Sequence, residues 1–269
     1  MLELYRTDEY FEGGDVGYAS YTALEPALRA TFRRLVRQLR RRGFGGDLLD
    51  LGCGYGFLLE EARSTFRSAT GTEFSERAAA VARARGLKVV TGGLHDLPAG
   101  SRFDCIVASH VVEHLYDPVA VLPTILARLR PGGSLVVATP DMGSAWRRLL
   151  GARWPSFKVP EHVLYLDRDA LGRLLAGAGF VAVRPMPFRH AFPLGLVVER
   201  AGLAPIARRL GRIARVPVWL PGTTVAAVGR RPAATDSAPA GPEPGARLTT
   251  AASESARPRP NRRPAHDDC

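Results

Sequence analysis

Short apolar runs alternate with helical patterns along most of this chain. The runs at residues 48–51, 69–72, 88–91, 103–109 and 134–139 have the length and composition of strands that are buried on both faces of a sheet. Two further strands are expected at residues 180–183 and 223–229. Strands that alternate with helices form a doubly wound α/β sheet, so this architecture is predicted, with the ligand at the carboxyl ends of the strands.

Helix starts and turns can be placed between these strands. Ser75, Asp117 and Asp167 each precede a helical pattern and have side chains that can accept a hydrogen bond from the first helical turn. Proline at position 118, the first helical position, supports the second of these starts. The helices are expected to end near Arg85, Leu129 and Gly179, and residues 131–133 (Pro-Gly-Gly) are expected to turn the chain into the fifth strand.

A glycine-rich loop follows the first strand, in the sequence LLDLGCGYGFLL at residues 48–59. A phosphate-binding P-loop needs a lysine and a hydroxyl after its last glycine, whereas Gly56 is followed by Phe57 and Leu58. A dinucleotide fingerprint needs G-x-G-x-x-G, and this loop reads G-x-G-x-G. The loop is therefore expected to bring a ligand close to the backbone without holding a phosphate.

A glutamate at the end of the second strand narrows the choice of ligand. Glu73, in the sequence ATGTEFS, lies about twenty residues after the loop, where a carboxylate can accept hydrogen bonds from the hydroxyl groups of a ribose. The sequence thus predicts a ligand with an adenosine-like ribose and no pyrophosphate.

Residues 40 to 230 resemble the class I S-adenosylmethionine-dependent methyltransferases, with the family motifs in order. The matching segments are LLDLGCGYG, GTEFS, GGLHDLP, FDCIVASHVVEHL and LRPGGSLVVATP. Two further segments are similar to those of the ubiquinone-type O-methyltransferases and their relatives. They are EHL after the fourth strand and, later in the chain, PEHVLYLDRDALGRLLAGAGF. The resemblance implies a seven-stranded, mostly parallel Rossmann-like sheet that ends in an antiparallel hairpin, and S-adenosyl-L-methionine as the cofactor.

The resemblance also implies roles for individual residues in cofactor binding. The methionine part of the cofactor would face Asp50 and the backbone of Gly52, Cys53 and Gly54. The ribose would contact Glu73, and the adenine would contact Phe74 and, at its amino edge, Asp96 and Leu97. The methyl-transfer face would be lined by Ser109 and His110. For Asp96 the alternative is an aspartate that only forms the turn before Pro98.

Methyl transfer to a hydroxyl requires a group that removes the proton, and histidine is suited to this near neutral pH. The candidate bases are His110, His114 and His162, and for each the alternative is a histidine that only packs or hydrogen-bonds a loop. SHVVEH also matches the zinc motif H-x-x-E-H, but that motif needs a sustained helix and Asp117 begins a new one. We therefore expect no metal.

The expected acceptor is a small molecule, most simply one that is methylated on oxygen. The chain lacks the Asp/Asn-Pro-Pro-aromatic run of enzymes that methylate exocyclic base amines, since residues 109–112 are Ser-His-Val-Val. Cys105 lies within a strand and is expected in the core, not as the nucleophile of a cytosine C5 methyltransferase. DNA is accordingly not expected as a substrate.

The formal net charge of +11 raises the question of an anionic partner. Residues 29–42 hold seven arginines and no acid, and residues 195–215 hold five arginines against Glu199. Lys88 and Lys158 are the only lysines among 37 basic residues, a bias typical of GC-rich genomes. Solvated helix faces are the expected explanation, and contact with an anionic partner or a membrane surface stays open.

The resulting organisation has three parts. Residues 1–42 are expected to form a lid and a helix, with Tyr10, Phe11, Tyr18 and Tyr21 covering the ligand or packing on the sheet edge. Residues 43–231 form the cofactor-binding domain, with acceptor-cap insertions near 141–166 and 190–220, and residues 232–269 form a disordered tail. No signal peptide or membrane-spanning stretch is recognised, so a cytoplasmic protein is expected.

Two other functions remain compatible with these sequence features. A nicotinamide-dependent reductase would keep the fold and change the ligand, and a non-catalytic interaction module would keep the fold and bind an anionic partner through its basic faces. The oligomeric state is not indicated by the sequence.

Overall fold

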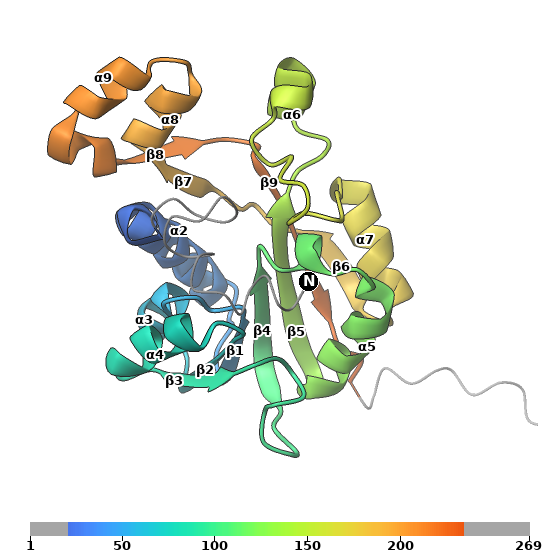
Figure 1. Cartoon of the computed structure of the whole chain (residues 1–269). Helices are drawn as coiled ribbons and strands as arrows, with labels where there is room; N and C mark the ends of the chain where they lie inside the picture. Colours follow the sequence, from blue (N-terminus) through green and yellow to red (C-terminus); the bar gives the residue numbers. More distant parts are fainter. Residues whose placement is uncertain (1–20, 234–269) are drawn as a thin grey trace, which may run out of the picture. The chain divides into compact units, whose positions relative to one another are not determined.

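The structure, a computed structural model, describes residues 21–233 and contains a seven-stranded sheet in the order β3-β2-β1-β4-β5-β9-β6 (Figure 1). Its strands are β1 (Asp47–Leu51), β2 (Ser68–Glu73), β3 (Lys88–Thr91), β4 (Phe103–Ser109), β5 (Leu129–Pro140), β6 (Val181–Pro185) and β9 (Thr224–Arg230). The first five are parallel, and β9 lies antiparallel between β5 and β6. The predicted seven-stranded, mostly parallel α/β sheet is confirmed.

The central strand β1 shows why these runs are apolar throughout. Leu48 and Leu49 are both fully buried, but successive side chains point to opposite faces of a sheet. Leu48 packs in the cluster that includes Leu35 and Leu58, whereas Leu49 packs in the cluster that includes Leu122. A strand covered on both faces needs apolar residues at every position, not at every second one.

Helices cover both faces of the sheet. On one face lie α2 (Tyr21–Arg41), α3 (Phe57–Ala62) and α4 (Glu76–Ala84); on the other lie α5 (Pro118–Arg128) and α7 (Arg168–Gly177) (Figure 1). The three predicted helix starts are confirmed. The side chains of Ser75, Asp117 and Asp167 each accept a hydrogen bond from the backbone N–H three residues later.

Strand β5 is longer than predicted, because it runs through residues 131–133, where a turn was expected. The strand tolerates Gly132 at a φ of 77° because the pairing between β4 and β5 shifts register between Phe103 and Cys105. Between these two pairs β4 advances by two residues and β5 by five, so β5 holds three extra residues here. Thus the Pro-Gly-Gly segment lies in an irregular part of strand β5.

Two segments add smaller elements outside the sheet. Between β5 and α7 lie α6 (Ala145–Leu150) and the 3-10 helix η3 (Gly151–Arg153). Between β6 and β9 lie β7 (His190–Pro193), α8 (Leu194–Arg200), α9 (Ala204–Arg209), η4 (Gly211–Arg215) and β8 (Pro217–Leu220). Strands β7 and β8 pair in a separate two-stranded antiparallel sheet, which the sequence patterns did not predict. A further 3-10 helix, η2 (Val112–His114), follows β4.

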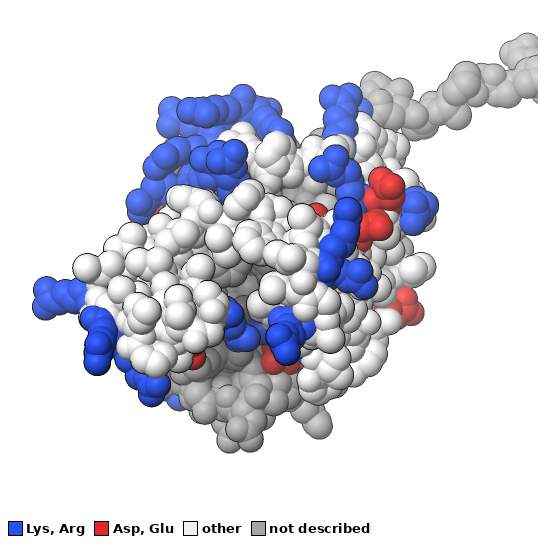
Figure 2. Space-filling model, turned by 90° about the horizontal axis from the view of Figure 1, so that it is seen from above, with Lys and Arg blue, Asp and Glu red and all other residues white. Residues whose placement is uncertain are grey.

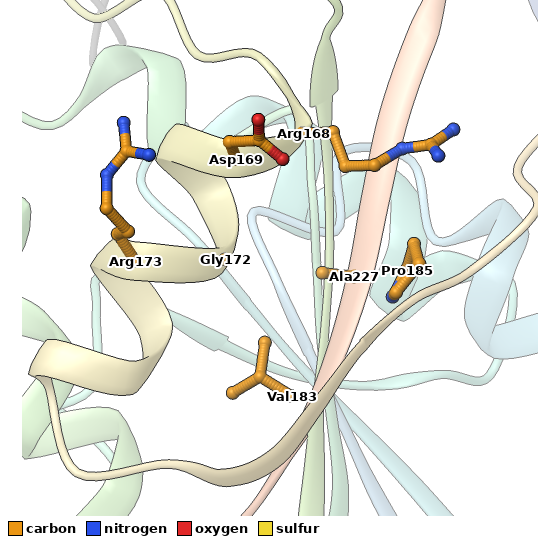
Figure 3. A pocket seen from close by; sticks show the side chains of 7 residues that line it. All are labelled: Arg168, Asp169, Gly172, Arg173, Val183, Pro185 and Ala227. Carbon is orange, nitrogen blue, oxygen red and sulfur yellow. The ribbon is translucent and has the colours of Figure 1, made fainter.

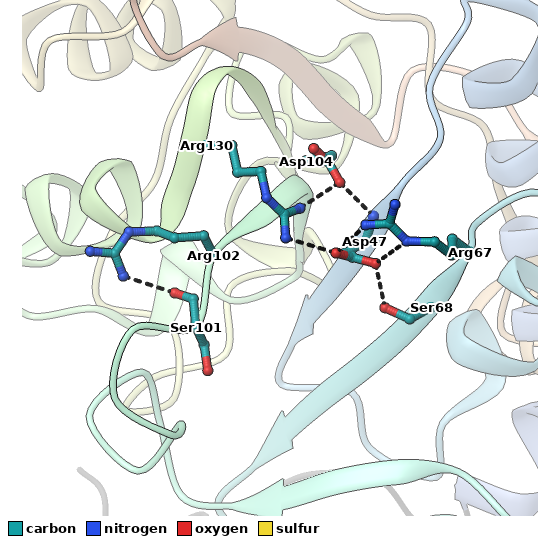
Figure 4. A network of polar contacts seen from close by, with 7 residues as sticks. All are labelled: Asp47, Arg67, Ser68, Ser101, Arg102, Asp104 and Arg130. Atoms are coloured by element: carbon teal, nitrogen blue, oxygen red, sulfur yellow. Dashed lines mark hydrogen bonds and ion pairs between the residues drawn. The ribbon is translucent and has the colours of Figure 1, made fainter.

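A charged network ties the first residues of neighbouring strands together at the edge opposite the glycine loop (Figure 4). Asp47 of β1 accepts hydrogen bonds from Arg67, Ser68 and Arg130, and Arg130 also pairs with Asp104 of β4. The hydrogen bond from Arg67 is the main reason why the pKa of Asp47 lies well below its usual range. The network joins β1, β2, β4 and β5 and so fixes their relative register.

Some predictions concern residues 1–20 and 234–269, which lie outside the described part of the chain. These are the lid residues Tyr10, Phe11 and Tyr18 and nearly all of the predicted disordered tail. Among residues 21–233, no helix combines the length and the apolar character that crossing a membrane requires.

Candidate active site

The glycine loop connects the end of β1 to the start of α3. Gly52 and Gly54 have φ angles of 65° and 52°, which are left-handed values that residues with a side chain rarely adopt. A Cβ atom on Gly54 would lie 2.8 Å from the hydroxyl oxygen of Tyr21, and one on Gly52 would lie 3.1 Å from Val111. The two glycines therefore provide a bare stretch of backbone at the carboxyl edge of the sheet.

The third glycine of the loop has a packing role. Gly56 caps the N-terminus of α3 with a φ of 80°, and a Cβ atom there would lie 2.2 Å from Leu87 and 3.3 Å from Ala82. Close packing of the loop on α4 and on the turn after it explains why glycine is needed at this position. This is the function that the third glycine of a dinucleotide fingerprint serves at a different spacing.

Glu73 lies beside the glycine loop, as its position at the end of β2 predicted. Its Oε2 atom accepts a hydrogen bond from the backbone N–H of Gly54 at 2.8 Å, and its Oε1 atom accepts one from Ser75 at 2.9 Å. Burial raises the pKa of Glu73, while these backbone donors oppose the shift. Burial and the charge of Glu73 also raise the pKa of Asp50 well above its usual range. Two buried acids side by side favour a cationic ligand.

The other predicted cofactor residues lie around the same loop. Phe74, Asp96 and Ser109 line the cavity described below, as do Cys53 and the two glycines. Asp96 also caps its own turn, since its Oδ2 atom accepts a hydrogen bond from the N–H of Gly93 at 2.8 Å. Leu97 is only 4% exposed, belongs to the core cluster around Ile106, and is not among the lining residues.

A cavity of about 1670 Å³ extends from the glycine loop to the two inserted segments. Its described lining includes Asp50, Glu73 and all three candidate bases, together with residues of α6, α8 and α9. A second cavity, of about 380 Å³, lies between α7 and strands β6 and β9 and is lined by none of the candidate site residues (Figure 3). The larger cavity therefore contains the candidate active site.

His110 follows β4 and is held in an unusual conformation. It is one of two non-glycine residues with positive φ among those described, at 56°, and its backbone N–H donates to Ala138 at 2.8 Å. Its Nδ1 atom lies 2.9 Å from Oε1 of Glu113, whose Oε2 atom accepts a hydrogen bond from Thr139. The Nε2 atom of His110 is buried and has no hydrogen-bond partner among the described residues. Left-handed backbone at such a residue is typical of functional sites.

The carboxyl group of Glu113 is ionised in this environment. Burial would raise its pKa, but the hydrogen bond from His110 and the charges of His110 and His114 outweigh burial and lower the pKa to about 2. An ionised carboxylate can only accept, so Nδ1 of His110 must carry a proton. In the neutral ring, the lone pair is then on Nε2.

His114 and His162 lie beside this pair, and their rings contact each other with centroids 4.8 Å apart. The Nδ1 atom of His114 donates to the carbonyl oxygen of Glu161, and that of His162 donates to the carbonyl oxygen of Ser156. Burial is the main cause that lowers both pKa values, to about 4 for His162. Both imidazoles are therefore neutral near pH 7.

Donor atoms of Glu113, His114 and His162 lie within 4.8 Å of one another, so this is the described group that could hold a metal ion. However, each carboxylate oxygen of Glu113 already accepts a hydrogen bond, from His110 or from Thr139. These two hydrogen bonds use two of the about four lone-pair positions of the carboxylate. The absence of a metal stays a prediction.

Sequence reasoning missed three polar residues of this network. Glu113 was considered only as part of a zinc motif, and Thr139 had no signal beyond its place at the end of the fifth strand. His190 comes from β7, and its ring lies 5.1 Å from that of His110, measured between centroids. Burial and the charge of His110 lower the pKa of His190 to about 3, so this histidine is also neutral.

The two inserted segments meet beside the cavity. Trp146 of α6 lines the cavity, and its Nε1–H donates to the carbonyl oxygen of Pro221 at 2.7 Å. Tyr21, at the start of α2, also lines the cavity and packs on Tyr55 and Phe57 of the loop region.

Comparison with known proteins agrees with this geometry. The family model described as a methyltransferase domain matches residues 22–184. The chain is 29% identical over 194 residues to a probable S-adenosylmethionine-dependent methyltransferase of Mycolicibacterium smegmatis, covering 70% of this chain and 74% of the relative. It is 28% identical over 165 residues to the ubiquinone biosynthesis O-methyltransferase of Aeromonas salmonicida, covering 56% of this chain and 69% of the relative.

Solved structures show the same fold. A possible histamine N-methyltransferase from Thermotoga maritima superposes with a TM-score of 0.56 at 19% identity, covering 78% of this chain and 92% of the other. The magnesium protoporphyrin IX methyltransferase of Synechocystis, solved with bound S-adenosylhomocysteine, also gives a TM-score of 0.56, at 13% identity, covering 85% and 97%.

The site itself fits an adenosyl sulfonium compound. The loop leaves bare backbone at Gly52 and Gly54, residues 52–56 carry no basic side chain for a phosphate, and the buried acids Asp50 and Glu73 suit a ligand with positive charge. Together with the family match, these features show that the chain belongs to the methyltransferase-domain family and is a class I S-adenosylmethionine-dependent methyltransferase.

Proposed function

We propose that this enzyme methylates a hydroxyl oxygen of a small organic acceptor and that His110 is the general base. The observation that carries the proposal is the contact between the His110 ring and the ionised, buried Glu113, which leaves Nε2 of His110 without a partner among the described residues. A buried lone pair without a partner is costly unless a ligand uses it.

The arrangement supports removal of a proton from a hydroxyl group. Glu113 fixes the tautomer of His110, so Nε2 is the nitrogen that can accept the proton. The imidazolium that forms would lie against a carboxylate and be stabilised by its charge. Thr139 and the left-handed backbone of His110 hold this pair in place.

S-adenosyl-L-methionine, when bound, supplies an electrophilic methyl group. We propose that its methionine part is held by Asp50, Gly52, Cys53 and Gly54, and its adenosine by Glu73 and Phe74. The edge of the adenine would be met by Asp96 and Leu97, and Ser109 would line the face where the methyl group is transferred. Residues that orient the acceptor against this methyl group contribute on the order of 7–11 kcal/mol in reactions of this type.

His114 and His162 are weaker candidates for the base. Each ring is oriented by a backbone carbonyl and not by a carboxylate, and burial lowers the pKa of both. A lowered pKa makes the nitrogen a poorer proton acceptor near neutral pH. We assign them a role in positioning the acceptor, together with the insertions at 141–166 and 190–220, whose residues line the far part of the cavity.

The proposal is tested by separating cofactor binding from acceptor chemistry. Calorimetric titration with S-adenosylhomocysteine measures the first, and NADH serves as the negative ligand. The second is measured by incubating the enzyme with S-adenosyl-L-methionine and paired acceptors that differ only in a hydroxyl or an amine, followed by mass spectrometry. O-methylated products from the hydroxyl members support the proposal; exclusive methylation of the amines contradicts it.

A further inference from the structure

The segment at residues 190–220, called the cap here, presents basic side chains to the outside. Arg200, Arg208, Arg209, Arg212 and Arg215 are all exposed, and Glu199 is the single acid of the cap. None of these arginines forms an ion pair within residues 21–233. The arginines of α2 differ, because Arg29 pairs with Glu25 and Glu60, and Arg33 pairs with Glu61. The cap thus carries uncompensated positive charge.

The same cap also exposes large apolar side chains. Four aliphatic side chains of the cap are each about half exposed: Leu203 (48%), Ile206 (51%), Ile213 (59%) and Val216 (49%). The helices α8, α9 and η4 contain no buried residue. Single exposed aliphatic residues are common on protein surfaces, but four of them interleaved with five arginines within 17 residues form an amphipathic surface.

The cap also lines part of the large cavity. Both small residues, such as Ala204 and Ala207, and the exposed arginines Arg200, Arg208 and Arg215 contribute to that lining. The helix α6 shares the lining and exposes 77% of Leu149. The helices α6, α8 and α9 lie on the same side of the molecule, beyond the ends of β4 and β5 (Figure 1). Seen from this side, basic side chains border the face and acidic ones are few (Figure 2).

We propose that the cap docks on the surface of an anionic lipid membrane. Arginines would contact the lipid headgroups, and the exposed aliphatic side chains would enter the boundary between headgroups and acyl chains, a combination typical of helices that lie on a membrane. A nucleic acid would use the arginines but would leave the aliphatic side chains in water. The membrane accounts for both.

Docking in this way would place the part of the cavity that the cap lines next to the bilayer. An acceptor dissolved in the membrane would then reach His110 through the cavity, past apolar residues of the cap such as Leu196 and Ala207. This part of the inference rests on the proposed function, whereas the docking itself does not depend on the reaction.

The test is co-sedimentation of the full-length protein with vesicles of phosphatidylglycerol and phosphatidylcholine, and with vesicles of phosphatidylcholine alone. Binding is expected only to the anionic vesicles. The variant R209Q/R212Q should bind about 25-fold more weakly, since each arginine at an anionic surface strengthens binding about fivefold. I206N/I213N should reduce the binding that persists at about 1 M salt, where the Debye length is about 3 Å and charge attraction is largely screened.

The matched control is R41Q/R42Q, which removes the same charge from exposed residues at the end of α2. This helix runs from Tyr21 beside the glycine loop to Arg41 before β1, so these arginines lie near the opposite edge of the sheet. The control should bind vesicles within about twofold of the unchanged protein, well short of the fivefold expected for one cap arginine. Equal losses in both variants, equal binding to neutral vesicles, or no vesicle binding by the unchanged protein would each overturn the docking. Titration with S-adenosylhomocysteine on the same samples separates these outcomes from failure of the proposed function.

Discussion

The Nδ1 atom of His110 lies 2.9 Å from Oε1 of Glu113, and Glu113 is only 1% exposed. This contact joins a residue at the end of β4 to one in the 3-10 helix η2, three positions later in the chain. It determines which nitrogen of His110 can accept a proton. The first two predictions depend on it.

Replacing His110 by Gln is expected to lower kcat by about 10²–10⁴-fold, the range that a positioned general base contributes. Affinity for S-adenosylhomocysteine should stay within about twofold, because His110 acts on the acceptor in the proposal. The checks are steady-state kinetics and calorimetry on the same preparation. A variant that retains more than half of the activity would exclude His110 as the base.

Replacing Glu113 by Gln is expected to reduce kcat strongly as well, although Glu113 acts only through His110. An amide at this position can donate to Nδ1 of His110 and so favours the wrong tautomer, a change that has cost about 10⁴-fold in the comparable Asp-His pair of serine proteases. A kcat within about twofold of that of the unchanged enzyme would show that Glu113 does not act through His110.

Replacing Gly54 by Ala is expected to weaken S-adenosylhomocysteine binding at least tenfold. The new Cβ atom would lie 2.8 Å from the hydroxyl oxygen of Tyr21 and would occupy the bare backbone of the loop. Gly100 is a matched control, because its φ is also left-handed at 76° and no atom lies within 4 Å of the corresponding Cβ. G100A should lose about 1 kcal/mol of stability through its left-handed backbone alone and keep its affinity. Equal affinities in the two variants would contradict the assignment of the loop.

Stability is expected to fall with pH between about 6.5 and 4. Burial lowers the pKa of His162 from 6.5 to about 4, so the unfolded chain binds a proton in this range that the folded protein does not. The stability that depends on neutral His162 is fully present above pH 6.5. It is lost as the pH falls toward the pKa of His162 in the folded protein, about 4. His190, with its pKa lowered to about 3, extends the decline to lower pH.

This effect is measured by thermal unfolding at several pH values. The Tm of the unchanged protein is compared with the Tm of H162Q at each pH. The variant should show a shallower decline between pH 6.5 and 4, because Gln does not titrate. Parallel curves for the two proteins would show that His162 does not carry the pH dependence.

Removal of metal ions is expected to leave methyl transfer unchanged. Glu113, His114 and His162 have donor atoms close together, but the carboxylate already accepts hydrogen bonds from His110 and Thr139. Enzyme treated with EDTA and then dialysed should keep its activity, and elemental analysis should find far less than one metal ion per chain. Loss of activity that zinc or manganese restores would establish a metal centre instead.

The sequence predicted the sheet well because its signals are local. A strand covered on both faces needs an unbroken apolar run, and each helix start needs a side-chain acceptor such as Ser75 or Asp167 at one position. The same holds for Glu73, whose place beside Gly54 follows from two neighbouring parallel strands that end at one edge.

The remaining parts depend on contacts between distant residues. His190 reaches His110 across 80 positions, and β7 pairs with β8 across the two helices α8 and α9 that separate them in the sequence. A turn was expected at the Pro-Gly-Gly segment because these residues suit both a turn and an irregular strand, and only the pairing of β5 with Phe103 and Cys105 decides between them. Local patterns cannot supply such information.

The position of β9 has a consequence for how the protein is made. This strand is the last of the sheet to be synthesised, yet it lies between β5 and β6, and within residues 21–233 β6 pairs with no other strand. Until about residue 230 has left the ribosome, the edge of β5 has no partner and α7 has no complete surface to cover. Translation that stops before β9 would therefore release a chain with an open, aggregation-prone strand edge.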